Sequence, residues 1–181
     1  VDELAKLLGD EFPGRTIIRM SAKTGEGFDV LCEFLDQRGQ FGQRLMEVDY
    51  DVYAEGEAEL GWLNSQVIVE TAAAFDLDAF LVGFLQRLQQ DLKAVAGETA
   101  HVKVIGLWEG FFGVANLVSS FTPPTLSLPS NCQAKRAEIV VNARVAIDPE
   151  MLTSCVRRAL DEQAQTIHAM LDVKTLQSFR P

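Results

Sequence analysis

The stretch AEIVVNARVAI at residues 137–147 decides the fold of this chain, because apolar side chains recur in it at every second position. Glu138, Asn142 and Arg144 lie at positions between them. Since successive side chains of a strand point to opposite faces of a sheet, the pattern predicts a strand with one buried and one partly polar face. The triplet Asp-Pro-Glu at residues 148–150 follows and predicts the start of a helix, since it supplies a capping side chain, a first-turn proline and an acid.

Patterns upstream of this strand predict further elements. One-sided alternation predicts a strand over residues 62–70, and a seam of leucines predicts a helix over residues 77–96. Strands are also predicted at residues 101–108 and 114–121, joined by a hairpin, whereas the three prolines of residues 122–134 predict a loop. The order β-α-β-β-β-α then predicts an α/β (α+β) fold of two layers, related to the ferredoxin-like arrangement. Both helices would cover one face of a mostly antiparallel sheet of four strands, leaving the other face, partly polar, available for docking.

The N-terminal residues have a different pattern. A helix is predicted over residues 3–9, a short buried strand at residues 15–20, and a second helix after the polar loop SAKTGEG at residues 21–27. An α-β-loop-α unit of this length is too short to form an α/β domain alone. We therefore predict that residues 1–45 are the incomplete end of such a domain and that residues 46–181 form a second, α+β domain.

Charge narrows the range of partners. The chain carries 16 basic and 26 acidic residues, for a formal net charge of −10, without a clustered basic face. Neither nucleic acid nor a membrane surface is therefore expected as a partner. Acidic residues alternate along residues 47–60, among them Glu55, Glu57 and Glu59. In an extended segment these carboxylates would line one edge and bind a divalent cation or a basic partner, or else form a solvated edge that prevents strand pairing.

The cysteines indicate the compartment. They form no C-x-x-C pair, which favours a reducing environment, and no apolar run is long enough for a membrane helix. These features predict a cytoplasmic protein. Cys32 and Cys155 fall within apolar helical patterns and are predicted to be buried, whereas Cys132 lies in a Pro/Ser-rich loop and is predicted to be accessible.

The polar residues of the second domain suggest a cluster rather than a catalytic site. His101 and Lys103 share one face of a predicted strand. Glu109, Asn142 and Arg144 are further candidates for a polar cluster on the open sheet face, the alternative being ordinary solvated surface. No spacing matches the common zinc patterns, and no local arrangement resembles a catalytic triad or carboxylate pair. No catalytic residue is therefore predicted.

Three segments carry a resemblance to known proteins. The loop Ser21-Ala22-Lys23 resembles the loop of P-loop GTPases whose backbone reads the guanine oxygen. The stretch at residues 101–107 (HVKVIGL), and the strand running into a helix at residues 137–152, resemble the C-terminal domain of CobW-type GTPases. These are relatives of UreG and HypB and act as metal chaperones or metalloenzyme assembly factors. The chain has no G-x-x-x-x-G-K-[ST] phosphate loop and no His-rich tract.

The resemblance implies that this chain is the C-terminal portion of a GTP-binding protein. GTP and Mg²⁺ would be cofactors of the parent protein, with Ser21, Ala22 and Lys23 at the guanine base and no tightly bound nucleotide on this chain alone. The second domain would deliver a metal such as Zn or Co, or dock a client metalloenzyme or assembly partner. Two alternatives remain: a protein-interaction module without a metal role, and part of an assembly or translation GTPase with a similar loop.

Overall fold

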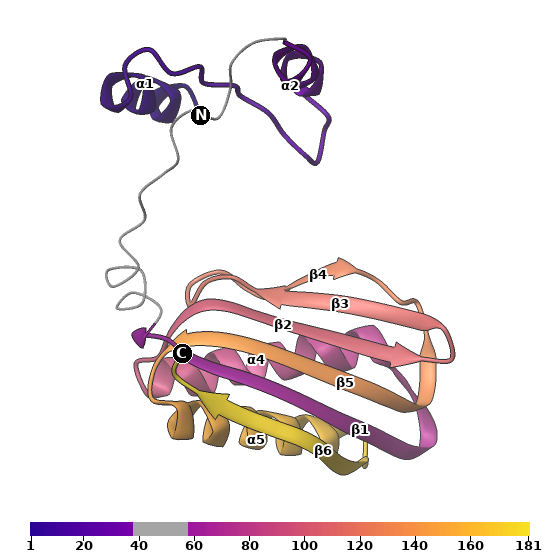
Figure 1. The fold of residues 1–181 in the computed structure, drawn as a ribbon. Helices are drawn as coiled ribbons and strands as arrows, with labels where there is room; N and C mark the ends of the chain where they lie inside the picture. Colours follow the sequence, from indigo (N-terminus) through magenta and orange to yellow (C-terminus); the bar gives the residue numbers. More distant parts are fainter. Residues whose placement is uncertain (38–57) are drawn as a thin grey trace. The chain divides into compact units, whose positions relative to one another are not determined.

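The computed structural model describes residues 1–37 and 58–181 (Figure 1). The chain divides into two units, residues 1–47 and residues 48–181. Within the described ranges, the first unit contains two helices, and the second contains a sheet with two helices packed against it. None of the helices in the described ranges is long and apolar enough to cross a membrane.

The first unit has less regular structure than the sequence predicts. Helices α1 (Asp2–Glu11) and α2 (Phe28–Leu35) occur where helices are predicted, but no residue of either is buried. The buried strand predicted at residues 15–20 is wrong: this segment has no strand structure, and all but Ile18 are exposed. A strand needs a hydrogen-bonded neighbour, and the described residues of this unit contain no other strand to pair with it.

The second unit is an α+β domain, as predicted. Its elements, in chain order, are β1 (Gly61–Asp76), α4 (Leu77–Ala94), β2 (Glu98–Trp108), β3 (Phe111–Leu117), β4 (Thr125–Leu128), β5 (Gln133–Ala146), α5 (Pro149–Thr166) and β6 (Met170–Phe179). The strands form one sheet in the order β4-β3-β2-β5-β1-β6, and every neighbouring pair is antiparallel.

The topology is ferredoxin-like with an addition at one edge. Strands β6, β1, β5 and β2 form two interleaved β-α-β units, in which α4 connects β1 to β2 and α5 connects β5 to β6. Strands β3 and β4 extend the sheet beyond β2. The sheet therefore has two more strands than predicted, because β4 lies inside the segment predicted as a loop and β6 has no regular apolar alternation.

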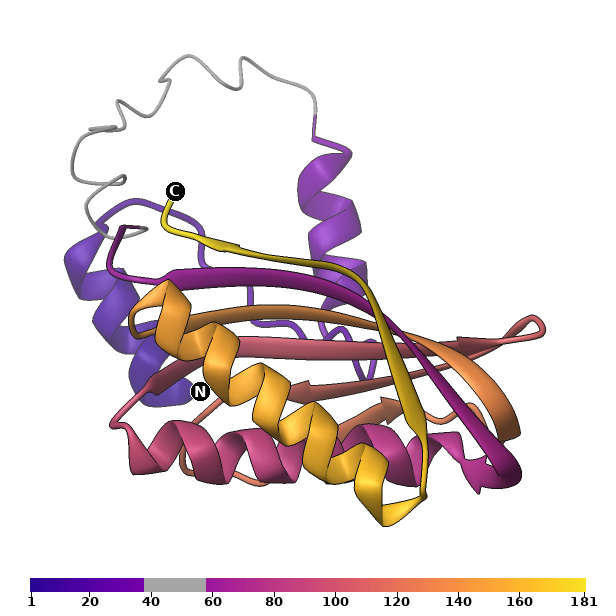
Figure 2. The ribbon, with the colours of Figure 1, turned by 90° about the horizontal axis from the view of Figure 1, so that it is seen from below.

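Both helices cover the same face of this sheet, as Figure 2 shows. The predicted leucine seam of α4 is buried and forms much of the core; its fully or nearly fully buried members are Leu77, Phe80, Leu81, Phe84, Leu85, Leu88 and Leu92. Asp76 caps α4 by accepting a hydrogen bond from the Ala79 amide at 2.9 Å, and Asp148 caps α5 in the same way. The core accordingly lies between the helices and one face, and no helix within residues 58–181 covers the opposite face of the sheet.

The connection from β4 to β5 is anchored to the start of α4. The Asp78 carboxylate accepts hydrogen bonds from the backbone amide and hydroxyl of Ser130 and from the Asn131 amide, each at 2.8 Å. The neighbouring Cys132 is buried, so its predicted accessibility is wrong. Cys32 is exposed, again contrary to the prediction, because no described residue of the first unit covers its helix.

Candidate functional site

A cluster of polar and aromatic side chains lies at one end of the open sheet face. The register places Arg144 of β5 beside Trp62 of β1 and His101 of β2. One step along the strands, Asn142 lies between Asn64 and Lys103. We call this set the open-face cluster; its members are Trp62, Asn64, His101, Lys103, Asn142 and Arg144. With Phe179 of β6 they line a hollow of about 350 Å³.

Direct contacts hold several members of the open-face cluster in place. The Asn142 side-chain amide donates a hydrogen bond to Asn64 Oδ1 at 2.7 Å. The Arg144 guanidinium carbon lies 3.9 Å from the centre of the Trp62 ring, which is a cation–π geometry. Phe179 flanks the indole, with ring centroids 6.1 Å apart. The guanidinium is thus held over an aromatic surface, a position from which its N–H donors can reach a ligand.

The orientation of His101 is set by a chain of side chains from the sheet edge. Asn116 donates its side-chain amide to Ser127 Oγ at 2.8 Å, and its oxygen lies 3.1 Å from His101 Nε2. Because that partner is an acceptor, the hydrogen bond requires a proton on Nε2. The other ring nitrogen is therefore the acceptor in the neutral imidazole and becomes a donor when the ring is protonated.

The donors of the open-face cluster lack acidic partners. Within residues 1–37 and 58–181, neither Lys103 nor Arg144 forms an ion pair. The indole N–H of Trp62 is buried and has no hydrogen-bond partner among the described residues. Two cations without an ion-pair partner among the described residues thus lie side by side with a histidine, in a chain of net charge −10. The arrangement is suited to binding a carboxylate or another anion.

An apolar area adjoins the open-face cluster on the same face. Val140 of β5 lies in register with Ile105 of β2, which in turn lies opposite Val114 of β3. The next row adds Leu107 and Phe112, whose exposed fractions are 39% and 51%. We call these five residues the apolar rows. The other three residues are half-buried. Contiguous apolar surface that is at least partly exposed beside polar groups is typical of protein-interaction sites.

The predicted guanine loop is a locally hydrogen-bonded turn. The Ser21 amide donates to the Glu26 carbonyl at 2.9 Å, and the Gly25 amide donates to the Ser21 carbonyl at the same distance. Ala22 and Lys23 are exposed, and their backbone amides have no hydrogen-bond partner within the described residues. The loop thus presents two backbone donors at its tip.

Glycine is required where this loop joins α2. Gly27 has a φ of +78°, and a Cβ there would collide with the Arg19 carbonyl oxygen. The local geometry therefore depends on the glycine pattern that singled out this segment in the sequence.

The predicted metal ligands are not brought into a site by the described structure. Glu55 and Glu57 lie outside the described residues, and Glu59 is exposed. Within residues 1–37 and 58–181, no group of three or more His, Cys, Asp or Glu side chains is arranged to hold a metal ion.

The sequence predicts only part of the open-face cluster. His101, Lys103, Asn142 and Arg144 come together, whereas Glu109 lies in the β2–β3 turn and lines a different hollow. Trp62 was not predicted as a member, although it lies two residues before Asn64 and so shares a face of the same strand. The contribution of Phe179 carried no sequence signal, since its strand was not predicted.

Comparison of the chain with protein-family models, with curated proteins and with solved structures finds no match. The resemblance to CobW-type GTPases therefore stays a prediction based on the quoted segments.

Proposed function

We propose that residues 58–181 are a docking domain that binds a client protein through its open sheet face. The observation that carries this proposal is a pair of cations beside the apolar rows, Lys103 and Arg144, that form no ion pair with another described residue. Charged groups without internal partners gain most from a partner that supplies the opposite charge, and the adjoining apolar surface gains from being covered. Trp62 and Arg144 are also residue types that dominate binding energy at protein interfaces.

The chemistry of the face specifies the client segment. It would present carboxylates to Lys103 and Arg144, and aliphatic or aromatic side chains to the apolar rows. This specification fits an acidic, amphipathic segment of a protein better than a polyanion, because a polyanion would leave the apolar rows uncovered and would be repelled by the chain's net charge.

The same proposal places this domain at the C-terminal end of a cytoplasmic CobW-type GTPase. Its support in the first unit is the loop at Ser21, Ala22 and Lys23, whose exposed tip offers the amides of Ala22 and Lys23 to a ligand. In the parent protein, GTP and Mg²⁺ would bind mainly through a phosphate loop that this sequence does not contain. The client would be a metalloenzyme or an assembly partner.

Binding to the open face can be tested with a model peptide and the full chain. The probe is a synthetic peptide in which glutamates alternate with leucine and phenylalanine, and the signal is the indole N–H resonance of Trp62 in NMR spectra. We expect saturable binding, weakened about tenfold or more by Lys103→Glu and by Arg144→Gln, since each removes a charge-assisted contact. Lys93→Gln, an exposed cation on α4 rather than on the open sheet face, is the matched control and should bind normally.

Two results would contradict the docking proposal. One is equal affinity for a peptide in which glutamine replaces every glutamate. The other is binding that the Lys103 and Arg144 variants leave unchanged.

Metal delivery is tested separately by titrating the full chain with Zn²⁺ or Co²⁺. Saturable binding that is lost when Glu55, Glu57 and Glu59 are all replaced by glutamine would support a metal role. Absence of binding would favour a docking module without one.

A further inference from the structure

Strand β6 forms an edge of the sheet in the described part of the second unit. Edge strands expose unpaired backbone groups, and charged side chains and bulges usually block them. The first half of β6 has both devices: Asp172 and Lys174 form an ion pair there, and the pairing with β1 is shifted at Gln66 and Val67. Residues 175–179, TLQSF, have no charged side chain, and no register shift interrupts their pairing with β1. Among the described residues, this half of β6 is therefore the part of the edge that is open to a further strand.

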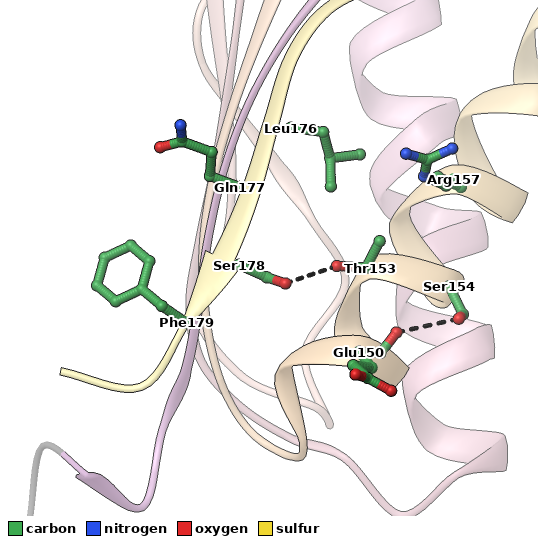
Figure 3. Close-up of a pocket in the computed structure, with 8 residues that line it drawn as sticks. All are labelled: Glu150, Thr153, Ser154, Arg157, Leu176, Gln177, Ser178 and Phe179. Atoms are coloured by element: carbon green, nitrogen blue, oxygen red, sulfur yellow. Dashed lines mark hydrogen bonds between the residues drawn. The ribbon is translucent and has the colours of Figure 1, made fainter.

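A groove of about 820 Å³ follows the open half of the edge, between β6 and α5 (Figure 3). Thr153 of α5 donates a hydrogen bond to Ser178 Oγ at 2.8 Å, which ties the helix to the strand. Figure 3 shows Leu176 directed toward α5, whereas Gln177 and Phe179 point away from it. A strand added here would thus place alternate side chains in the groove and on the open sheet face.

The charged residues beside this groove could pair with the same residues of a second copy of the chain. Glu150 lies three residues before Thr153 and Arg157 lies four residues after it, and both line the groove. Neither residue forms an ion pair with any other described residue. An acid and a base on either side of a central point exchange places under two-fold rotation about that point. Self-complementarity of this kind is what an isologous dimer contact requires.

We propose that residues 175–179 pair with the same residues of a second copy of this chain, in an antiparallel two-fold dimer. With the axis near Gln177, the two Gln177 residues lie directly opposite each other in the paired strands. Leu176 then lies opposite Ser178 of the second copy. Such an axis runs perpendicular to the sheet, so both helix layers lie on the same side and the two α5 helices face each other across the grooves. Glu150 of each copy then meets Arg157 of the other. This contact uses the sheet edge, a different surface from the open-face cluster.

The test is analytical ultracentrifugation of the full chain over a range of concentrations. We expect a monomer–dimer equilibrium for the wild type. Arg157→Glu and Glu150→Arg should each raise the dimer dissociation constant at least about tenfold, because each places like charges across the axis. The double variant Glu150→Arg/Arg157→Glu restores the opposite pairing and should recover affinity to within about threefold of the wild type. Lys135→Glu, an exposed charge reversal on β5 outside the groove, is the control and should not change it.

Hydrogen exchange localises the contact. Those amides of residues 175–179 that point away from β1 should become protected as the concentration of wild type rises, and should not do so in Arg157→Glu. A chain that stays monomeric overturns the proposal, as does a dimer that is insensitive to both single reversals or one that the double variant fails to restore. Unchanged far-UV circular dichroism in each variant keeps a folding defect from being read as lost association.

Discussion

The replacement Asp78→Asn tests the hydrogen bonds that anchor the β4–β5 connection to the start of α4. The carboxylate accepts two hydrogen bonds at Oδ1 from Ser130 and one at Oδ2 from the Asn131 amide. Asparagine keeps the shape but offers only one oxygen. If that oxygen faces Ser130, the new amide group meets the Asn131 N–H, so one hydrogen bond is replaced by two opposed donors. The variant therefore weakens the connection without creating a cavity.

The expected loss of stability follows from these contacts. A hydrogen bond to a charged group contributes about 1.5–3 kcal/mol where water is excluded. Asp78 is half-buried, so water can replace part of what is lost. The remaining bonds also lose their charge assistance. We expect Asp78→Asn to lower the free energy of unfolding by about 2 kcal/mol.

The chain offers a selective assay for this change. Both tryptophans, Trp62 and Trp108, lie in the second unit, so fluorescence during urea unfolding reports on that unit alone. Asp161→Asn, an exposed aspartate on α5, is the matched control and should change stability by less than about 0.5 kcal/mol.

The pH dependence gives the reasoning a second, independent check. Partial burial raises the pKa of Asp78, but the hydrogen bonds from Ser130 and Asn131 outweigh it and hold the pKa below its ordinary value of 3.8. A carboxyl whose pKa is lower in the folded state stabilises the fold above the unfolded-state pKa, and this contribution is lost as the pH falls through the folded-state pKa. The stability gap between wild type and Asp78→Asn should therefore be constant near neutral pH and shrink toward about pH 3. A gap that is unchanged or wider in acid would refute the role assigned to the carboxylate.

Two other substitutions probe the core by the same unfolding assay. In Gly106→Ala the new Cβ would lie 2.7 Å from Leu77 Cδ1 in fully buried surroundings. We therefore expect the free energy of unfolding to fall by about 1–3 kcal/mol. An unchanged urea midpoint would mean that α4 can move away from the sheet. In Thr99→Val the lost hydroxyl is buried and has no hydrogen-bond partner among the described residues. The free energy of unfolding should therefore stay the same or rise by up to about 1 kcal/mol. A clear loss of stability would indicate a hydrogen bond from the hydroxyl to water.

The sequence predicts the interior of the second unit better than its edges. Strand β5 and the leucine seam of α4 are recognisable because burial on one face imposes a strict period on their side chains. Strand β6 lacks this period, since one side of it borders the open edge and a register shift interrupts its pairing with β1. Strand β4 has 4 residues and is bounded by prolines, and its pairing with β3 depends on the tertiary fold rather than on a local pattern.

The open-face cluster shows how much the alternation of side chains along a strand can predict about a site. Because residues two positions apart in a strand lie on the same face, the sequence places His101 with Lys103, and Asn142 with Arg144, on one face. It does not say which strands are neighbours, and the register of β1 and β2 against β5 is what brings the two pairs together beside Trp62. The strand predicted at residues 15–20 failed for the related reason that apolar residues indicate burial only when the fold provides a surface to cover them.

The two proposed surfaces are compatible, and their positions connect them. Phe179, the last residue of the open half of β6, lies in register with Trp62, so the open-face cluster lies at the same end of the sheet as the proposed dimer contact. A two-fold axis perpendicular to the sheet keeps both open faces on the same side of the joined sheet. The dimer would thus bring two open-face clusters near one another across β6, where a client with two acidic segments could bind both. Binding of the second segment would then be intramolecular, so the dimer contact would raise the affinity for such a client without adding any contact within either cluster.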